Sequence, residues 1–166
     1  NEIVEMHDMN ISGCIAFTDD KKSIQRSDVL KIAMLYSKDC NAIIMNYPND
    51  KIISENGCVN EGVTSTKLGL KGIPSLAEEI MLDRDLSLCE YTKSKLHISY
   101  ISTSSSVAKI KKAKSKGLDV TSDVTIYNLF LTDEKINDFD TRYKVIPPLR
   151  TIKDIRSLIK ALQNGT

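Results

Sequence analysis

The chain is poor in the residues that most often build metal and redox sites. It has four cysteines and two histidines in 166 residues, and no two cysteines form a Cys-x-x-Cys pair. A structural zinc site is therefore not expected. Cys14, Cys40 and Cys89 stand among apolar residues, which is typical of buried thiols and predicts a cytoplasmic protein. The only imidazoles belong to His7 and His97.

A strong net charge and a long apolar run are also missing. The formal net charge is +1, so no strong field steers the chain toward nucleic acid or an anionic membrane. No apolar run approaches the roughly 20 residues that span a bilayer. The opening NEIVEMHDMN is polar and lacks an initial Met, so it does not resemble a signal peptide and the natural N-terminus could lie elsewhere. We expect no nucleic-acid partner and no membrane.

Along the chain, short apolar runs alternate with segments whose apolar residues recur at helical spacing. The strand-like runs are 13–17, 42–45, 96–101 and 120–124, and the helix-like segments are 27–35, 75–82, 106–114 and 152–162. This order predicts right-handed βαβ units with a parallel sheet in a single domain. Ser27 is a candidate helix cap, Ser75 and Glu78 have capping-box spacing, and Gly117 signals a helix end.

Two segments interrupt this rhythm. The connection 46–74 is too long for a simple loop, and long loops after strands are usually functional. The segment 109–116 carries five lysines. No aromatic residues or glycine-rich loop accompany them, so a solvated helix face is favoured over a nucleic-acid patch.

The end of the second apolar run raises a question about chemistry. Active sites of α/β enzymes lie at the carboxyl ends of parallel strands. Here the run 42–45 ends at Asn46, and no histidine, cysteine or carboxylate follows until Asp50. The strand therefore has the position of an active-site strand but an unreactive residue at its tip.

Six strings, in order, resemble bacterial dihydroorotases of the amidohydrolase superfamily. They are GCIAFTDD (13–20), GCVNEG (57–62), LGLKGIPSLAEEIMLDRDLSL (68–88), LHISYISTSSSV (96–107), VTSDVT (120–125) and PPLR (147–150). The resemblance implies an α/β fold, a segment of an amidohydrolase (β/α)8 TIM barrel covering about strands four to seven, with residues 1–166 as one partial domain. It also implies a role in pyrimidine biosynthesis, where the family interconverts dihydroorotate and carbamoyl aspartate, usually with zinc.

The resemblance further implies which residues occupy the family's metal-ligand positions. In the retained FTDD string, Asp19 is the first candidate for the ligand carboxylate and Asp20 the second. The next two ligand histidines correspond to Asn46 and Tyr100, which are vacated positions expected to point into the barrel mouth. His97 should face the opposite side from Tyr100 and serve as a packing histidine. Without a metal, a strand-end turn or helix cap is the favoured role for the two aspartates.

Other family positions have changed or lie outside the chain. The family's Pro-His-His corresponds to Ile126-Tyr127-Asn128, and its substrate-contacting asparagine corresponds to Ile146. Its first-strand His-x-His pair and eighth-strand aspartate have no counterpart here. Arg150 could bind an anion, but a surface or loop-pinning role is favoured. We expect no catalytic residue and no cofactor in this chain, and its substrate-binding residues are unknown.

Three hypotheses for function remain open. In the first, the chain is a non-catalytic homologue whose role is interaction, since inactive members of the family can serve as a scaffold for aspartate transcarbamoylase. In the second, it is an active zinc-dependent cyclic amidohydrolase whose altered metal site is completed by parts of the chain not present here. In the third, it is a decaying gene product with no role.

A half-barrel also carries an expectation about assembly. Its two unpaired edges should be the runs 13–17 and 120–124, and Ile44, Leu96 and Ile98 should face the missing wall. Unpaired edges and an apolar concave face promote association. The expected partner is the remainder of its own barrel, a second copy or another subunit.

Overall fold

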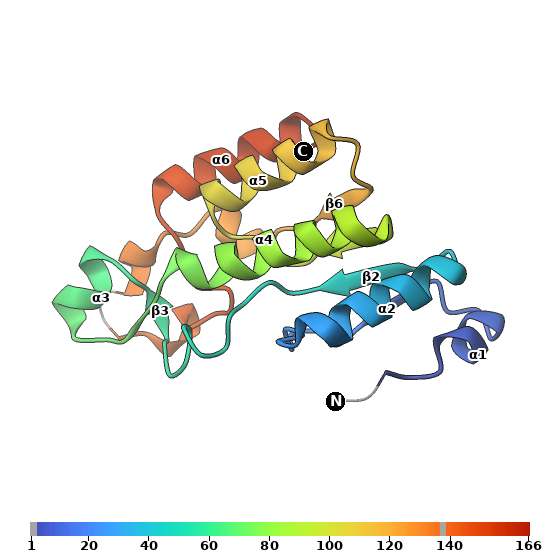
Figure 1. Cartoon of the computed structure of the whole chain (residues 1–166). Helices are drawn as coiled ribbons and strands as arrows, with labels where there is room; N and C mark the ends of the chain where they lie inside the picture. The colour runs from blue at the N-terminus through green and yellow to red at the C-terminus, as the bar shows by residue number, and fades with distance from the viewer. Residues whose placement is uncertain (1–2, 137–138) are drawn as a thin grey trace.

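Four parallel strands form the central sheet of the protein (Figure 1). The structure is a computed structural model that describes residues 3–136 and 139–166. The strands are β1 (Ala16–Thr18), β2 (Ile43–Asn46), β5 (Lys95–Ile98) and β6 (Val120–Ser122), in the order β1-β2-β5-β6. Each predicted run overlaps one of them, and β1 and β6 are the edges as expected. The parallel α/β barrel segment is confirmed.

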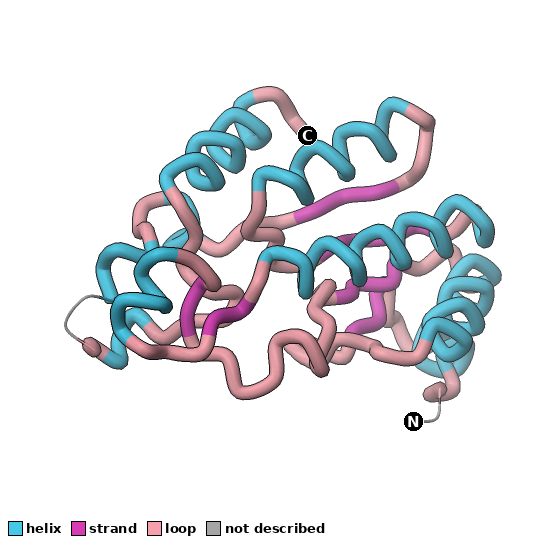
Figure 2. Tube along the Cα trace, turned by 60° about the vertical axis from the view of Figure 1, so that its left-hand side comes forward, coloured by secondary structure: helices cyan, strands magenta, loops and turns pink. Residues whose placement is uncertain are grey.

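The long helices lie side by side over one face of this sheet (Figures 1 and 2). They are α2 (Ser27–Asp39), α4 (Ser75–Thr92), α5 (Ser104–Ser115) and α6 (Ile152–Gln163), and a short α1 (Met6–Ile11) precedes them. Helix α4 ends ten residues beyond its predicted limit, whereas α5 and α6 each end one residue beyond theirs. Apolar periodicity indicates which face of a helix is packed, but it locates the ends of the helix less well. Gly117 follows α5 with φ of 82°, which agrees with its predicted role as a helix end.

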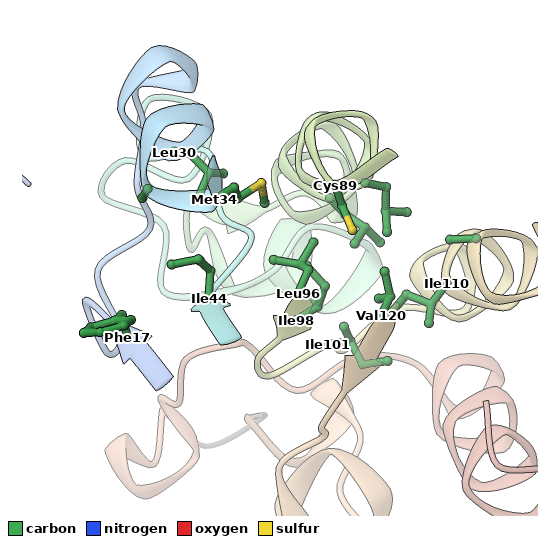
Figure 3. Packing of buried hydrophobic residues seen from close by; sticks show 14 of the residues in the cluster. Phe17, Leu30, Met34, Ile44, Cys89, Leu96, Ile98, Ile101, Ile110 and Val120 are labelled. Atoms are coloured by element: carbon green, nitrogen blue, oxygen red, sulfur yellow. The ribbon is translucent and has the colours of Figure 1, made fainter. Parts of the chain in front are cut away.

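The strand register decides which side chains meet the helices. Phe17, Ile44, Leu96 and Val120 are register partners in neighbouring strands, and all four are buried. Figure 3 shows Ile44 and Leu96 directed toward the helices that carry Leu30, Met34 and Cys89. The expectation that Ile44, Leu96 and Ile98 face a missing wall is therefore wrong. The helices need an apolar partner, and in a period-two strand the same row cannot also line the open face.

The open face of the sheet is lined by the alternate residues. Thr18, Met45, His97 and Thr121 are register partners across the four strands. Thr18 and Thr121 are exposed, whereas Met45 and His97 are half-buried. Three of these four side chains are polar, so the open face is not the apolar surface that was expected.

The two predictions for the N-terminal ends of helices, at Ser27 and at Ser75 with Glu78, are wrong. Ser27 is the first residue of α2 and makes no side-chain cap hydrogen bond. At the start of α4 the cap residue is Pro74, and the Glu78 carboxylate accepts hydrogen bonds from Ser102 and Thr103 instead. Tertiary partners at the start of α5 have replaced the local partner that the sequence spacing indicated.

The connection 46–74 folds into a small lobe. It holds β3 (Val59–Asn60), α3 (Val63–Leu68) and β4 (Gly72–Ile73), and β3 pairs with β4 in parallel. Three 3₁₀ turns follow β6: η1 (Ile126–Leu129), η2 (Asp133–Ile136) and η3 (Thr141–Tyr143). A Cβ atom at Gly72 would lie 2.5 Å from Cα of Glu61, so glycine permits this close approach.

The lysines of α5 are partly paired with carboxylates of α4. Nζ of Lys109 lies 2.5 Å from Asp83, and Nζ of Lys116 lies 3.4 Å from Glu90. These contacts agree with the predicted solvated helix face. Within the described residues, no helix is both long and apolar enough to cross a membrane.

Candidate functional site

The candidate site lies at the edge of the sheet where the four parallel strands end. Asp19 and Asp20 directly follow β1, Asn46 ends β2, Tyr100 comes two residues after β5, and Asp123 directly follows β6. Because parallel strands end on the same side, residues far apart in the sequence share this edge. The sequence analysis placed four of these residues in the site and did not single out Asp123.

The two aspartates after β1 lie in an exposed turn. Asp20 adopts a left-handed conformation with φ of 54°, and its N–H donates to Oγ1 of Thr18 at 2.9 Å. The main-chain oxygen of Asp19 accepts from the N–H of Lys22. This geometry is the strand-end turn that was favoured, and a ligand role for Asp19 or Asp20 stays a prediction.

Asn46 is buried beneath this edge, with only 2% of its surface exposed. Its Nδ2 donates to Oδ2 of Asp85 on α4 at 2.6 Å, and its Oδ1 accepts from the main-chain N–H of Ile24 at 3.2 Å. The side chain is therefore directed toward the helix layer, and the expectation that it points into the barrel mouth is wrong. The amide finds a buried and a half-buried partner there, which a solvent-facing position would not supply.

Asp85 is the centre of a buried cluster that sequence reasoning missed. Arg84 donates from Nε and Nη2 to Oδ1 of Asp85 at 2.8 and 2.6 Å, and its Nη1 donates to the main-chain oxygens of Ile24 and Gln25. Burial raises the pKa of the Asp85 carboxyl to about 6, against the opposing effects of Arg84 and Asn46. The available signal was an aspartate three residues after the predicted helix 75–82, at helical spacing from the apolar Met81 and Leu82.

Three tyrosines gather near the ends of β2, β5 and β6. The rings of Tyr47 and Tyr100 make an edge-to-face contact with centroids 6.0 Å apart. The hydroxyl of Tyr127 donates to the main-chain oxygen of Ile146 at 2.8 Å. Burial raises the pKa of both Tyr47 and Tyr127, so these phenols stay neutral at physiological pH.

His97 lies on the open face of the sheet with both ring nitrogens in hydrogen-bond distance of a partner. Nδ1 is 2.8 Å from Oγ1 of Thr121, and Nε2 is 3.0 Å from Oδ2 of Asp123. The histidine is thus satisfied, as predicted. Partial burial raises the pKa of the Asp123 carboxyl, but the hydrogen bonds from His97 and the Tyr100 N–H outweigh it, so that pKa lies below its ordinary value.

Arg150 is buried and ties the small lobe to the barrel segment. Its Nε donates to Oγ of Ser102 at 3.0 Å, and its Nη1 donates to Oδ1 of Asn60 at 2.8 Å and to the main-chain oxygen of Ile73 at 2.9 Å. Nη2 lies 4.0 Å from the Glu78 carboxylate. Of the anion-binding, surface and loop-pinning roles considered for Arg150, the loop-pinning role describes these contacts.

Within the described residues, the donor groups at this edge do not by themselves make up a zinc site. Across residues 3–136 and 139–166, no three histidine, cysteine or carboxylate side chains converge as a metal site requires. The Asn46 amide is committed to Asp85 and Ile24, and Tyr100 presents a phenol. No step of a metal-assisted reaction can be assigned to these residues.

Sequence comparison identifies relatives along the whole chain. A family model described as Dihydro-orotase-like matches residues 1–106. The chain is 44% identical over 165 residues to dihydroorotase of Thermoanaerobacter sp. (strain X514) and 42% identical over 165 residues to dihydroorotase of Acetivibrio thermocellus. These alignments cover 99% of this chain but only 38% and 39% of the relatives, so the chain spans a little over a third of their length.

Structural comparison finds the same architecture in more distant proteins. A D-hydantoinase matches with a TM-score of 0.78 at 21% identity, over 99% of this chain and 39% of its own. L-hydantoinase (dihydropyrimidinase) from Arthrobacter aurescens matches with a TM-score of 0.79 at 20% identity, over 97% of this chain and 38% of its own. At these identities the likeness concerns the fold alone, and it agrees with a barrel segment.

Proposed function

The chain belongs to the dihydroorotase-like family, and from this premise we propose that it is a non-catalytic homologue whose role is structural, as a scaffold for aspartate transcarbamoylase. Hydrolysis of a cyclic amide in this family needs a metal to polarise the carbonyl and to lower the pKa of a water. The proposal is that the residues at two ligand positions of this segment now serve the fold.

The observation that carries the proposal is the environment of Asn46. A carboxamide is not among the ligands that zinc ordinarily takes, which are thiolate, imidazole and carboxylate. Both polar atoms of this amide are hydrogen-bonded, to Asp85 and to Ile24, and its side chain is buried. Removing it would leave the half-buried N–H of Ile24 and the buried Oδ2 of Asp85 without this partner, so selection for folding alone suffices to keep it.

Exposed apolar side chains support the interaction role. Ile126, Phe130 and Ile146 are 69%, 72% and 52% exposed, and the Tyr127 hydroxyl, one residue after Ile126, donates to the main-chain oxygen of Ile146. Where exposed apolar side chains form a contiguous patch, they are typical of contacts with another protein. The choice of aspartate transcarbamoylase as the partner rests on the family resemblance.

A second candidate function is supported by Asp19 and Asp20. Both carboxylates are exposed at the edge where the strands end, and carboxylates are suitable zinc ligands. In this alternative the protein is an active zinc-dependent cyclic amidohydrolase that converts dihydroorotate to carbamoyl aspartate. Its altered site would be completed by residues outside the present chain.

Metal content and turnover of the purified protein separate the two functions. We expect no stoichiometric zinc and no hydrolysis of dihydroorotate when zinc is added. About one tightly held metal per chain, lost in the Asp19→Ala/Asp20→Ala variant, would favour the second function and contradict the first. Asp28→Ala serves as the matched variant, because it removes an exposed aspartate of α2 that is paired with Arg26 and should leave metal content unchanged.

A partner test addresses the scaffold role directly. Purified aspartate transcarbamoylase from the same organism should bind the chain in sedimentation or calorimetry, and Phe130→Ser/Ile146→Ser should weaken that binding. No association at micromolar concentrations of both proteins would refute this partner.

A further inference from the structure

We propose that His97 and Asp123 form a positioning pair that holds the main chain of residue 100 in a left-handed conformation and thereby presents the residue-100 side chain at the site edge. The pair spans β5 and β6 and lies beside the metal-ligand position without occupying it. The inference concerns the geometry of the edge and is independent of whether the protein is catalytic.

The first step is the conformation of Tyr100. Its φ is 61°, in the left-handed region that side-chain-bearing residues adopt only at a cost of about 1–3 kcal/mol. Tyrosine has no local hydrogen bond to offset this cost, unlike asparagine or aspartate. The surrounding structure must therefore impose the turn.

Asp123 supplies the hydrogen-bonding groups that hold the main chain around Tyr100. Its main-chain N–H donates to the oxygen of Ile98 at 3.1 Å, and its main-chain oxygen accepts from the N–H of Ile101 at 3.1 Å. Between these two bonds, its carboxylate Oδ1 accepts from the N–H of Tyr100 at 2.7 Å. The residue directly after β6 thus satisfies main-chain groups on both sides of Tyr100 and the N–H of Tyr100 itself.

His97 fixes the carboxylate that makes this central bond. Its Nε2 lies 3.0 Å from Oδ2 of Asp123, the oxygen that does not contact Tyr100. Its Nδ1 lies 2.8 Å from Oγ1 of Thr121, so the ring is anchored at both nitrogens. The imidazole therefore restrains carboxylate rotation and orients Oδ1 toward the Tyr100 N–H.

The consequence is the placement of the Tyr100 ring. With residue 100 in this left-handed conformation, the Tyr100 ring meets the ring of Tyr47, and the two ring centroids are 6.0 Å apart. Loss of the pair should release the turn and with it this aromatic contact. On this proposal, His97 and Asp123 still hold residue 100 at the site edge. The residue that they hold is a tyrosine, where the family resemblance implies a histidine.

Fluorine NMR of the protein labelled with 3-fluorotyrosine tests this, with Tyr100 assigned by Tyr100→Phe. We expect Asp123→Ala to shift the Tyr100 resonance and to speed amide exchange at residue 100 at least tenfold. Asp123→Asn should rescue the exchange rate, since its amide oxygen can still accept the N–H. His97→Gln should broaden or shift the Tyr100 resonance and speed the exchange by a smaller factor.

Asp28→Ala is the matched control, because it removes an exposed aspartate paired with Arg26 and should leave both readouts unchanged. Unchanged readouts in folded Asp123→Ala would overturn the proposal. An effect of Asp123→Ala without any effect of His97→Gln would overturn the pair and leave Asp123 acting alone. If Asp123→Ala does not fold, Asp123→Asn and His97→Gln decide by the same two criteria.

Discussion

Nδ2 of Asn46 donates a 2.6 Å hydrogen bond to Oδ2 of Asp85, which joins the end of β2 to the middle of α4. Through Oδ1 the same amide holds the N–H of Ile24, and Arg84 holds the oxygens of Ile24 and Gln25. The loop after β1 is thereby fastened to the second strand and to the helix above it. The residue at the tip of β2 therefore connects the strand, the loop after β1 and α4 in this fold.

Asp85→Ala should be strongly destabilising. It leaves Arg84 and Asn46 without their buried acceptor, and breaking a buried ion pair costs roughly 3–5 kcal/mol. Urea unfolding monitored by circular dichroism measures the change in free energy. Asp83→Ala is the matched control, because Asp83 is an exposed partner of Lys109 and should cost about 1 kcal/mol or less. Equal losses in the two variants would contradict the role assigned to Asp85.

Asn46→Asp should destabilise the protein in a way that acid relieves. The new carboxylate has the shape of the amide but would face Asp85 at the distance of the present hydrogen bond, and two carboxylates so close cannot both ionise. We expect a lower free energy of unfolding at pH 7 than in the wild type and a smaller deficit at pH 5. A deficit that is the same at both values would show that the two carboxylates do not interact.

Asp85→Asn should change how stability depends on pH. The pKa of Asp85 is raised to about 6 in the folded protein, so the folded state binds this proton more tightly than the unfolded state does. Its contribution to stability is fully present below about pH 4 and is lost as pH rises through about 6. The variant should lack this loss, so the difference between the two unfolding profiles should change between about pH 4 and 6 and be constant above. A constant difference throughout would mean that Asp85 keeps an ordinary pKa.

Arg150→Met should loosen the small lobe. The substitution preserves much of the apolar stem but removes the hydrogen bonds to Ser102, Asn60 and Ile73, and leaves Glu78 buried without a cation nearby. We expect a loss of roughly 3 kcal/mol or more and faster amide exchange in β3 and β4. Arg142→Met, which removes an exposed pair with Asp140, is the control and should change neither.

Association through the strand edges remains the expected behaviour of this chain. The polar open face removes one reason for association, but β1 and β6 are still edge strands, and Ile15 beside β1 is 79% exposed. Sedimentation at micromolar concentration should detect oligomers, and Ile15→Lys should shift the distribution toward monomer. A monomer that melts cooperatively would show that these edges need no partner.

Much of the architecture follows from local patterns in the sequence. The four apolar runs and the helical periods between them predict the parallel sheet, because burial of a helix face and of the sheet face that it covers leaves a repeating signal along the chain. The FTDD string also predicts the turn that follows β1. These features depend mainly on neighbours within a few residues.

The contacts that define the site were decided only by the tertiary structure. Glu78 has the spacing of a helix cap but binds Ser102 and Thr103, and Asn46 stands at a strand tip but binds Asp85, 39 residues away. Which face Ile44 and Leu96 present depends on strand register, and a shift of one residue exchanges the two faces. Polar groups that become buried take whichever partners the packed fold brings near, and the sequence alone does not specify them.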